Sequence, residues 1–244
     1  MQEEYKKHIS SRFDSELESL CNQFIAMGGL VEQQVSDAVV ALIEGNLELA
    51  DAVIEKDDIV NDYERKIDER VELMLAKRQP AAGDLRLTLM LSKATTDLER
   101  IGDEAAKIAR VASQMDKQGH SPRGDSESRN LSAQVCSMIH EALDAFARFD
   151  LEHALKVVKT DQKIDEEYAS TMRALLTYIL EDNRYITQVI NVMWVLRAIE
   201  RVGDHARNVA EQVIYVICGE DVRHIDIDQI QRRVDSQSEA QKGR

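Results

Sequence analysis

The feature that most constrains the fold is a twelve-residue phrase that occurs twice. Residues 98–109 read LERIGDEAAKIA, and residues 199–210 read IERVGDHARNVA, 101 positions further along the chain. Each copy contains, in order, a glutamate, an arginine, an apolar residue, a glycine and an aspartate. A repeat of this length indicates that the chain consists of two copies of one structural unit, each with the same local site.

A second match supports the duplication. Residues 47–57, LELADAVIEKD, correspond to residues 151–161, LEHALKVVKTD, at an offset of 104. The offset falls from 104 to 101 because the following connection is three residues shorter in the second copy. With 244 residues, the chain is long enough for two units of about 120 residues each.

The periodicity of each unit predicts long helices. Apolar residues recur three and four apart, and only two prolines and ten glycines interrupt the chain. Asn46 and Asp150 are good N-caps, and Gly28-Gly29 predicts a bend or a close helix contact. Six helices are expected, over residues 14–44, 47–77, 84–115, 127–149, 151–181 and 184–217. We therefore predict an all-α fold, a tandem repeat of two elongated antiparallel three-helix bundles, with helices up to about 45 Å long.

The domain boundary is predicted from a change in composition. Residues 117–126, KQGHSPRGDS, collect glycine, proline, serine and charge. The predicted organisation is a first repeat over residues 1–118, a linker over 119–126, a second repeat over 127–220 and a polar tail of weak helical potential over 221–244.

The net charge of −14 limits the partners. This charge argues against nucleic acid as a partner, because duplex binding needs a basic footprint. Free phosphate and anionic membranes are repelled on average, whereas divalent cations and basic protein surfaces are attracted. The acidic balance has an alternative explanation, which is solubility alone.

The compartment follows from the cysteines and from the apolar runs. Cys21, Cys136 and Cys218 are far apart and form no CxxC pair, which favours a reducing compartment over a disulfide framework or a thiolate zinc site. The N-terminus lacks an apolar signal-peptide core, and runs such as Val213–Cys218 are too short to span a bilayer. A cytoplasmic protein is expected.

The repeated carboxylates lie away from the predicted core. At 100° per residue, Glu99 and Asp103 lie well over 90° from the centre of the apolar seam of their helix, and Glu200 and Asp204 lie at the same place in theirs. They should therefore share a flank or an outer face. The glycine between each pair costs about 1 kcal/mol in a helix, and it allows another group to approach closely.

The second helix of each unit supplies further oxygen ligands. Asp57 and Asn61 correspond to Asp161 and Asp165, and the short turn brings them toward the acids of the third helix. Such oxygen-rich clusters suit Mg, Mn or Fe, and the cofactor expected is a divalent or iron-type ion, Zn included. His205 could add a nitrogen ligand, although a surface histidine is more often only solvated. The predicted metal ligands are Asp57, Asn61, Glu99, Asp103, Asp161, Asp165, Glu200 and Asp204.

Two other interpretations compete with metal binding on the bundle surface. Asp103 has Lys107 one turn on, and Arg100 and Arg201 could pair with acids of neighbouring helices, so the carboxylates could be ordinary ion-pair partners. The same carboxylates could also serve a metal-dependent enzyme or a metal-storage bundle. The Glu-x-x-His of di-iron carboxylate proteins, the P-loop, the nucleophile elbow and HExxH do not occur, so no enzyme is predicted.

Several motifs in order resemble the PhoU family, phosphate-signalling regulators of bacteria. They are the doubled ERxGD phrase, GGxVEQQ at Gly28–Gln34, KRQPxxxDLR at Lys77–Arg86 and ALDAFARxD at Ala142–Asp150. The resemblance extends from about His8 to His224.

The resemblance implies a fold and a function. It implies two three-helix bundles related by a pseudo-twofold axis, often as a homodimer, with metal bound at E/D-x-x-x-D motifs. The first repeat departs from the strict motif at Asn61. It also implies a negative regulator of phosphate uptake and of the phosphate-starvation response. Such a protein is a cytoplasmic adaptor between the ATP-binding subunit of the phosphate ABC transporter and the phosphate-sensing histidine kinase, peripheral to membrane complexes and not inserted in the membrane.

Overall fold

The chain is helical throughout the computed structural model, which describes residues 11–118, 124–223 and 225–242. The helices are α1 (Ser11–Glu44), α2 (Leu47–Arg78), α3 (Ala82–Gln118), α4 (Asp125–Arg148), α5 (Leu151–Glu181), α6 (Ile186–Cys218) and α7 (Ile227–Lys242), with a 3₁₀ turn, η2 (Asn183–Tyr185), before α6. The prediction of six long helices is confirmed, and each of their ends lies within three residues of the expected position.

The two repeats begin their second helices with the same capped turn. The side chain of Asn46 accepts a hydrogen bond from the Leu49 N–H at 3.0 Å. Asp150, at the equivalent position, accepts from the N–H groups of Glu152 and His153 at 2.9 and 3.1 Å. Both side chains satisfy backbone donors that a helix start leaves unpaired, so the two predicted N-caps are confirmed.

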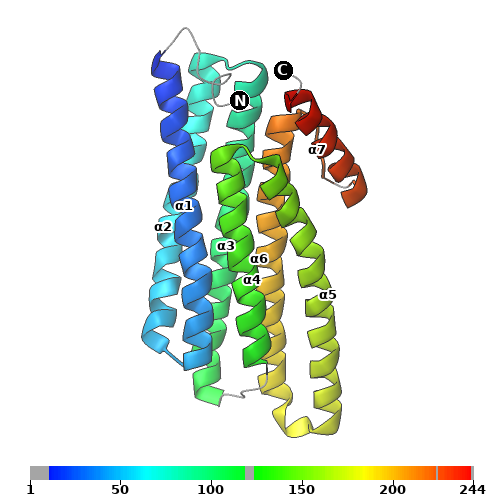
Figure 1. The fold of residues 1–244 in the computed structure, drawn as a ribbon. Coiled ribbons are helices and arrows are strands. Elements are labelled where there is room, and N and C mark those ends of the chain that lie inside the picture. Colours follow the sequence, from blue (N-terminus) through cyan, green and yellow to red (C-terminus); the bar gives the residue numbers. More distant parts are fainter. Residues whose placement is uncertain (1–10, 119–123, 224, 243–244) are drawn as a thin grey trace.

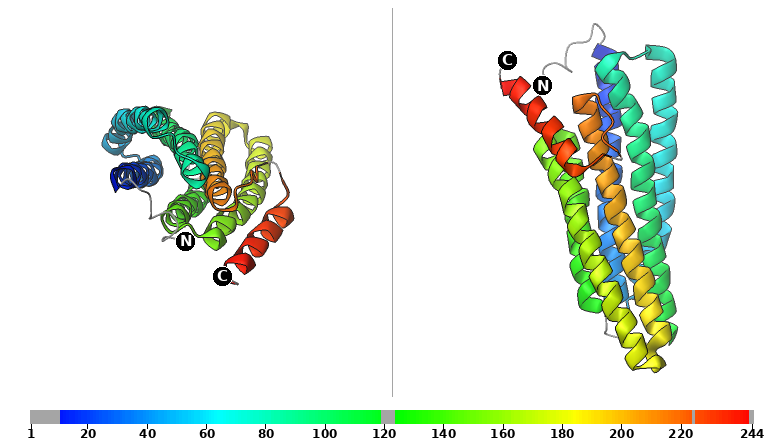
Figure 2. Two further views of the ribbon diagram at one scale, coloured as in Figure 1. Left: turned by 90° about the horizontal axis from the view of Figure 1, so that it is seen from above. Right: turned by 90° about the vertical axis from the view of Figure 1, so that its right-hand side faces the viewer.

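Each repeat is a three-helix bundle, and the two bundles pack along α3 and α6. Figures 1 and 2 show α1, α2 and α3 on one side and α4, α5 and α6 on the other, with α3 and α6 running antiparallel at the centre. These two helices carry the duplicated phrase, so the two copies face each other across the middle of the molecule. The arrangement agrees with the pseudo-twofold relation expected between the repeats.

A close contact between α1 and α4 also joins the bundles. A methyl group placed on Gly28 would lie 2.4 Å from Leu143 Cδ2, whereas one placed on Gly29 would meet nothing within 4 Å. The expected close helix contact is therefore made by Gly28, which lets α1 approach the buried Leu143.

The C-terminal region differs from the prediction. The expectation of weak helical potential after Gly219 is wrong, because Ile227–Lys242 forms α7, which packs against α5 and α6 (Figure 1). The most buried of its few apolar side chains, Ile230 and Val234, are 0% and 2% exposed, and Ile227 also packs against the core. Burial against α5 and α6 stabilises a helix whose own composition is too polar to predict it. Of the predicted linker 119–126, residues 119–123 lie outside the described part, and α4 already begins at Asp125.

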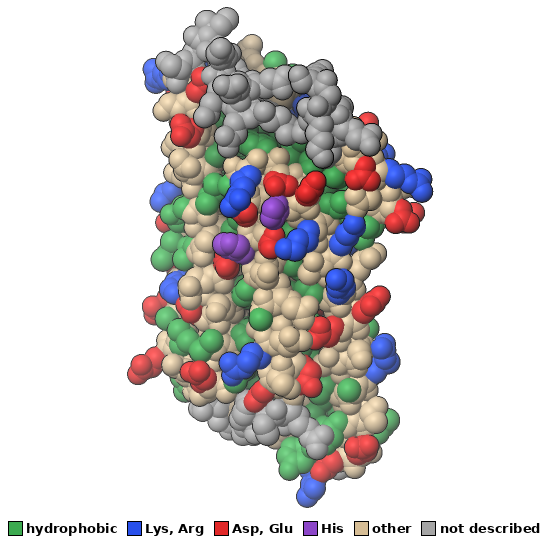
Figure 3. All heavy atoms as spheres, in the orientation of Figure 1, with side chains coloured by type: hydrophobic (Ala, Val, Ile, Leu, Met, Phe, Trp, Pro, Cys, Tyr) green, Lys and Arg blue, Asp and Glu red, His purple; other side chains and the backbone are tan. Residues whose placement is uncertain are grey.

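The surface combines mixed charge with one exposed apolar region. Figure 3 shows acidic, basic and histidine side chains intermixed across the middle of one face. The exposed apolar side chains at the far ends of α5 and α6 are Leu176, Leu180, Ile186, Ile190 and Trp194. Leu180 is 87% exposed and Trp194 is 63% exposed, which is unusual for such large apolar side chains. Within the described residues, every helix is too short or too polar to be a membrane span.

A candidate metal centre in each repeat

The glycine of each duplicated phrase brings the neighbouring helix close. A methyl group placed on Gly102 would lie 3.5 Å from Asp57 Oδ1, and one placed on Gly203 would lie 3.7 Å from Asp161 Oδ1. Each glycine therefore faces the aspartate of the preceding helix. This contact positions the carboxylates of α2 beside those of α3, and the carboxylates of α5 beside those of α6.

Three aspartates converge in the second repeat. Asp161 and Asp165, one turn apart on α5, and Asp204 on α6 each offer a carboxylate oxygen, and these oxygens all lie within 4.8 Å of one another. Carboxylates this close repel one another unless a proton or a cation lies between them. Among the acidic, histidine and cysteine side chains of the described residues, these three form the group whose ligand atoms lie close enough together to hold a metal ion.

Glu200 lies one turn before Asp204 on α6, close enough for the charges of the three aspartates to act on it. Its Oε1 accepts a hydrogen bond from Arg197 Nη1 at 2.5 Å, while Oε2 is buried and has no hydrogen-bond partner. Burial, and next the charge of Asp204, raise the pKa of Glu200 to about 7. A carboxylate oxygen that is buried and unpaired beside three aspartates is suited to binding a cation.

Asp161 is the most buried acid of the cluster. It is 1% exposed, and Glu200 is 9% exposed. Of the two places expected for Glu200, a flank or an outer face, the outer face is therefore wrong, and Glu200 lies on a covered flank. The flank of α6 that points away from its apolar seam is covered by α5, a packing relation that helical periodicity alone does not reveal. Burial raises the pKa of Asp161 to about 6, although the hydrogen bond from Arg207 opposes this rise.

The first repeat holds a looser group of acids. Burial, and next the charge of Asp103, raise the pKa of both Asp57 and Glu99. Asn61 is half-buried one turn beyond Asp57, at the position that Asp165 occupies in the second repeat. An amide at this position gives the first repeat one fewer anionic ligand.

Glu64 joins the first-repeat group and was missed by the sequence reasoning. Its pKa is raised mainly by burial and next by Asp68, and its charge in turn raises the pKa of Glu99. Thr96 Oγ1 donates a hydrogen bond to Glu64 at 3.4 Å. The available signal was its spacing, since residue 64 follows Asp57 by seven positions on the same face of α2. Comparison of the two repeats does not identify Glu64, because the equivalent position in the second repeat is Tyr168.

His205 belongs to the junction between the repeats. Its Nδ1 lies 2.9 Å from Asp97 Oδ1 on α3, and Asn208 donates to the same oxygen at 2.9 Å. Arg201 likewise contacts Glu104 of α3 at 3.2 Å. The proposed nitrogen ligand is therefore engaged with α3, and the arginine pairs with an acid of the other repeat.

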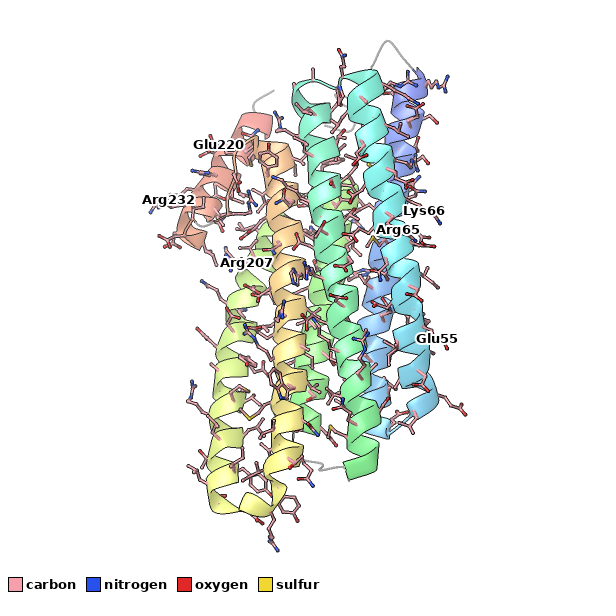
Figure 4. The ribbon with its side chains drawn as sticks, turned by 180° about the vertical axis from the view of Figure 1, so that it is seen from behind. Glu55, Arg65, Lys66, Arg207, Glu220 and Arg232 are labelled. Carbon is pink, nitrogen blue, oxygen red and sulfur yellow. The ribbon has the colours of Figure 1, made fainter. Side chains whose placement is uncertain are left out.

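Solvent reaches the second cluster from the side of α6. Asp204 and Arg207 both line a cavity of about 420 Å³, together with Arg201, His205, Asn208, Glu211 and Arg223. Figure 4 shows Arg207 on the side of α6 that faces α5, below the start of α7. An ion can therefore approach Asp204 without a rearrangement of the bundle.

The donor chemistry fits a hard divalent cation. The second cluster supplies only carboxylate oxygens, one of them buried without a partner, and Mg²⁺, Mn²⁺ and Ca²⁺ prefer such ligands. The first repeat adds an amide oxygen at Asn61. Neither group resembles a zinc site built from cysteine and histidine.

Known proteins share both the repeats and the fold. The family model described as "PhoU domain" matches residues 24–112 and 129–213. The phosphate-specific transport system accessory protein PhoU homolog of Pseudomonas aeruginosa is 53% identical over 229 residues, 94% of this chain and 95% of that protein. The accessory protein PhoU of Escherichia coli K12 is 44% identical, over 93% of each chain.

Two solved structures show the same architecture. The crystal structure of PhoU from Pseudomonas aeruginosa superposes with a TM-score of 0.84 at 54% identity, covering 86% of this chain and all of the other. The phosphate transport system regulatory protein PhoU from Streptococcus pneumoniae superposes with a TM-score of 0.80 at 27% identity, covering 86% and 99%. The all-helical tandem arrangement predicted from the sequence is therefore confirmed.

Proposed function

Because the chain belongs to the PhoU family, we propose that it is a negative regulator of phosphate uptake and of the phosphate-starvation response. In this role it is a cytoplasmic adaptor between the ATP-binding subunit of the phosphate ABC transporter and the phosphate-sensing histidine kinase. The observation that carries the proposal is the match of both repeats to the family, together with close relatives named as accessory proteins of phosphate-specific transport. The protein acts as a homodimer beside membrane complexes.

The carboxylate clusters are the metal-binding part of this function. We propose that Asp161, Asp165, Glu200 and Asp204 hold a divalent cation, which neutralises their mutual repulsion. The first-repeat acids, with Asn61, hold another. Unpaired Glu200 Oε2 and the three converging aspartates support this assignment. The cation is structural or regulatory, and the protein is not an enzyme.

Binding to protein partners is supported by the exposed apolar region of α5 and α6. Large apolar side chains gathered on a surface mark sites of protein contact. Leu180 and Trp194 are the most exposed of this group. Replacing them with polar residues should weaken partner contacts and leave the buried seams of the bundles unchanged.

A phosphate-starvation reporter tests the proposal in cells. Deletion of the gene should raise the reporter in high phosphate, and the native chain should restore repression. Trp194→Ser with Leu180→Ser should restore it poorly, while the exposed Leu73→Ser, on α2, serves as a matched control. Sustained repression in the deletion strain would overturn the regulatory proposal.

Metal analysis separates the adaptor from a metal-dependent enzyme. Purified protein should bind Mn²⁺ or Mg²⁺, and chelation should lower its melting temperature without loss of helicity. Phosphatase and oxidase assays should show no turnover. Robust turnover that Glu200→Ala abolishes would instead favour the enzyme.

A further inference from the structure

The two centres differ at the positions that surround their acids. Arg197 and Arg207 lie three residues before and after Glu200 and Asp204 on α6. The equivalent positions on α3 are Thr96 and Ala106. Two guanidinium groups therefore accompany the second cluster where the first repeat has a hydroxyl and a methyl group.

Arg207 occupies an oxygen of the second cluster. Its Nη1 donates to Asp161 Oδ2 at 3.0 Å, and its Nε donates to Glu211 Oε1 at 2.9 Å. Both acids are buried, at 1% and 4% exposed, so these charge-assisted hydrogen bonds are little weakened by water. The guanidinium therefore offsets part of the negative charge of the cluster and shares its own charge with Glu211.

A divalent cation bound to the Asp161 carboxylate would lie beside the guanidinium, and repulsion between the two positive charges opposes simultaneous occupation. The Arg207 side chain has space to move away from Asp161, because it borders the cavity of about 420 Å³. Its hydrogen bond to Glu211 can be kept when it moves. Another candidate ligand atom, Glu200 Oε2, is buried and has no hydrogen-bond partner, so a cation can bind it without displacing Arg207. Asp161 Oδ2 is therefore bound by an internal cation, Arg207, whereas Glu200 Oε2 can accept an external cation.

We propose that Arg207 is an internal counter-ion that competes with divalent cations for Asp161 and so sets the affinity of the second-repeat centre. The inference rests on the proposed metal binding by this cluster. Arg207 thereby limits the cation affinity of its centre, a role that the uncharged residue at the equivalent position, Ala106, cannot have. Cation binding releases Arg207 from α5 while Glu211 holds it on α6.

Manganese binding to the full-length chain tests the proposal. The first-repeat centre is removed with Glu99→Gln and Asp103→Asn, and free Mn²⁺ is measured by electron paramagnetic resonance at pH 8. In this background, Arg207→Ala should bind Mn²⁺ at least about tenfold more tightly, the factor that one charge-assisted hydrogen bond supplies. Arg207→Gln gives the same comparison if the alanine variant does not fold.

A matched control and a second measurement distinguish competition from a general change of charge. Arg201→Ala removes another guanidinium of α6, one that pairs with Glu104 of α3, and should leave Mn²⁺ affinity nearly unchanged. The rise in melting temperature on adding Mn²⁺ should be larger for Arg207→Ala than for the parent. If a folded Arg207 variant binds Mn²⁺ as tightly as the parent or more weakly, the proposed competition is wrong. If neither parent nor variant binds Mn²⁺, the proposed metal function fails as well, and the cellular reporter tests regulation separately.

Discussion

Replacing Glu200 with glutamine should stabilise the metal-free protein at alkaline pH. Burial and the neighbouring aspartates raise the pKa of Glu200 from its ordinary 4.5 to about 7, so its ionised form is disfavoured in the folded state. A rise of this size corresponds to about 3 kcal/mol. Because the carboxylates titrate together, we expect Glu200→Gln to gain about 1–3 kcal/mol in the free energy of unfolding at pH 8.

The pH dependence of the unfolding free energy provides a second test of this prediction. An acid whose pKa is higher in the folded state binds a proton more tightly there, so the native protein gains stability as pH falls from about 7 toward 4.5. The advantage of the glutamine variant should therefore be present at pH 8 and small near pH 4.5. Urea denaturation of chelator-treated protein, followed by circular dichroism at both pH values, measures it.

The first repeat provides the matched control. Burial and Asp103 also raise the pKa of Glu99, but its side chain is 19% exposed against 10% for Glu200. Glu99→Gln should therefore stabilise less. The reasoning is refuted if Glu200→Gln is no more stable than the native chain at pH 8, or if its advantage is the same at both pH values.

The remaining predictions concern packing. Gly29→Ala should stabilise by up to about 1 kcal/mol, because no atom lies within 4 Å of the new methyl group. Gly28→Ala should be less stable than Gly29→Ala by about 1–3 kcal/mol, because it meets Leu143. Thermal unfolding compares the two, and equal melting temperatures would contradict the close approach of α1 and α4. Val234→Asp should detach α7 and expose a protease site near Ile227, with the long helices retained. Asp235→Asn, on the exposed face, should resist proteolysis as the native chain does.

The long helices and their caps were predictable because the information is local. The apolar positions repeat with helical spacing over six segments, and Asn46 and Asp150 have the side chains that a helix start requires. The last helix was not predictable in this way. Ile227, Ile230 and Val234 form only a two-turn apolar stripe in an otherwise polar segment, and the stability that they provide depends on burial against α5 and α6.

Duplication predicted the acids of the candidate centres, but it did not predict that Asp161 and Glu200 are buried. Duplication located the residues that both repeats share, but it could not reveal Glu64, whose counterpart is Tyr168. The contact of Arg207 with Asp161 joins residues 46 positions apart, so it depends on how α5 lies beside α6. Periodicity gives the face of one helix and leaves open which neighbour covers it.

Each centre is built from two helices of a single repeat, and this has an evolutionary consequence. The described acids of the first centre come from α2 and α3, and those of the second come from α5 and α6. A substitution in one centre leaves the ligands of the other in place, so the duplicated halves can diverge independently. Because both halves belong to one polypeptide, two candidate centres of different composition are always inherited and synthesised in a one-to-one ratio, which separately encoded copies would not guarantee.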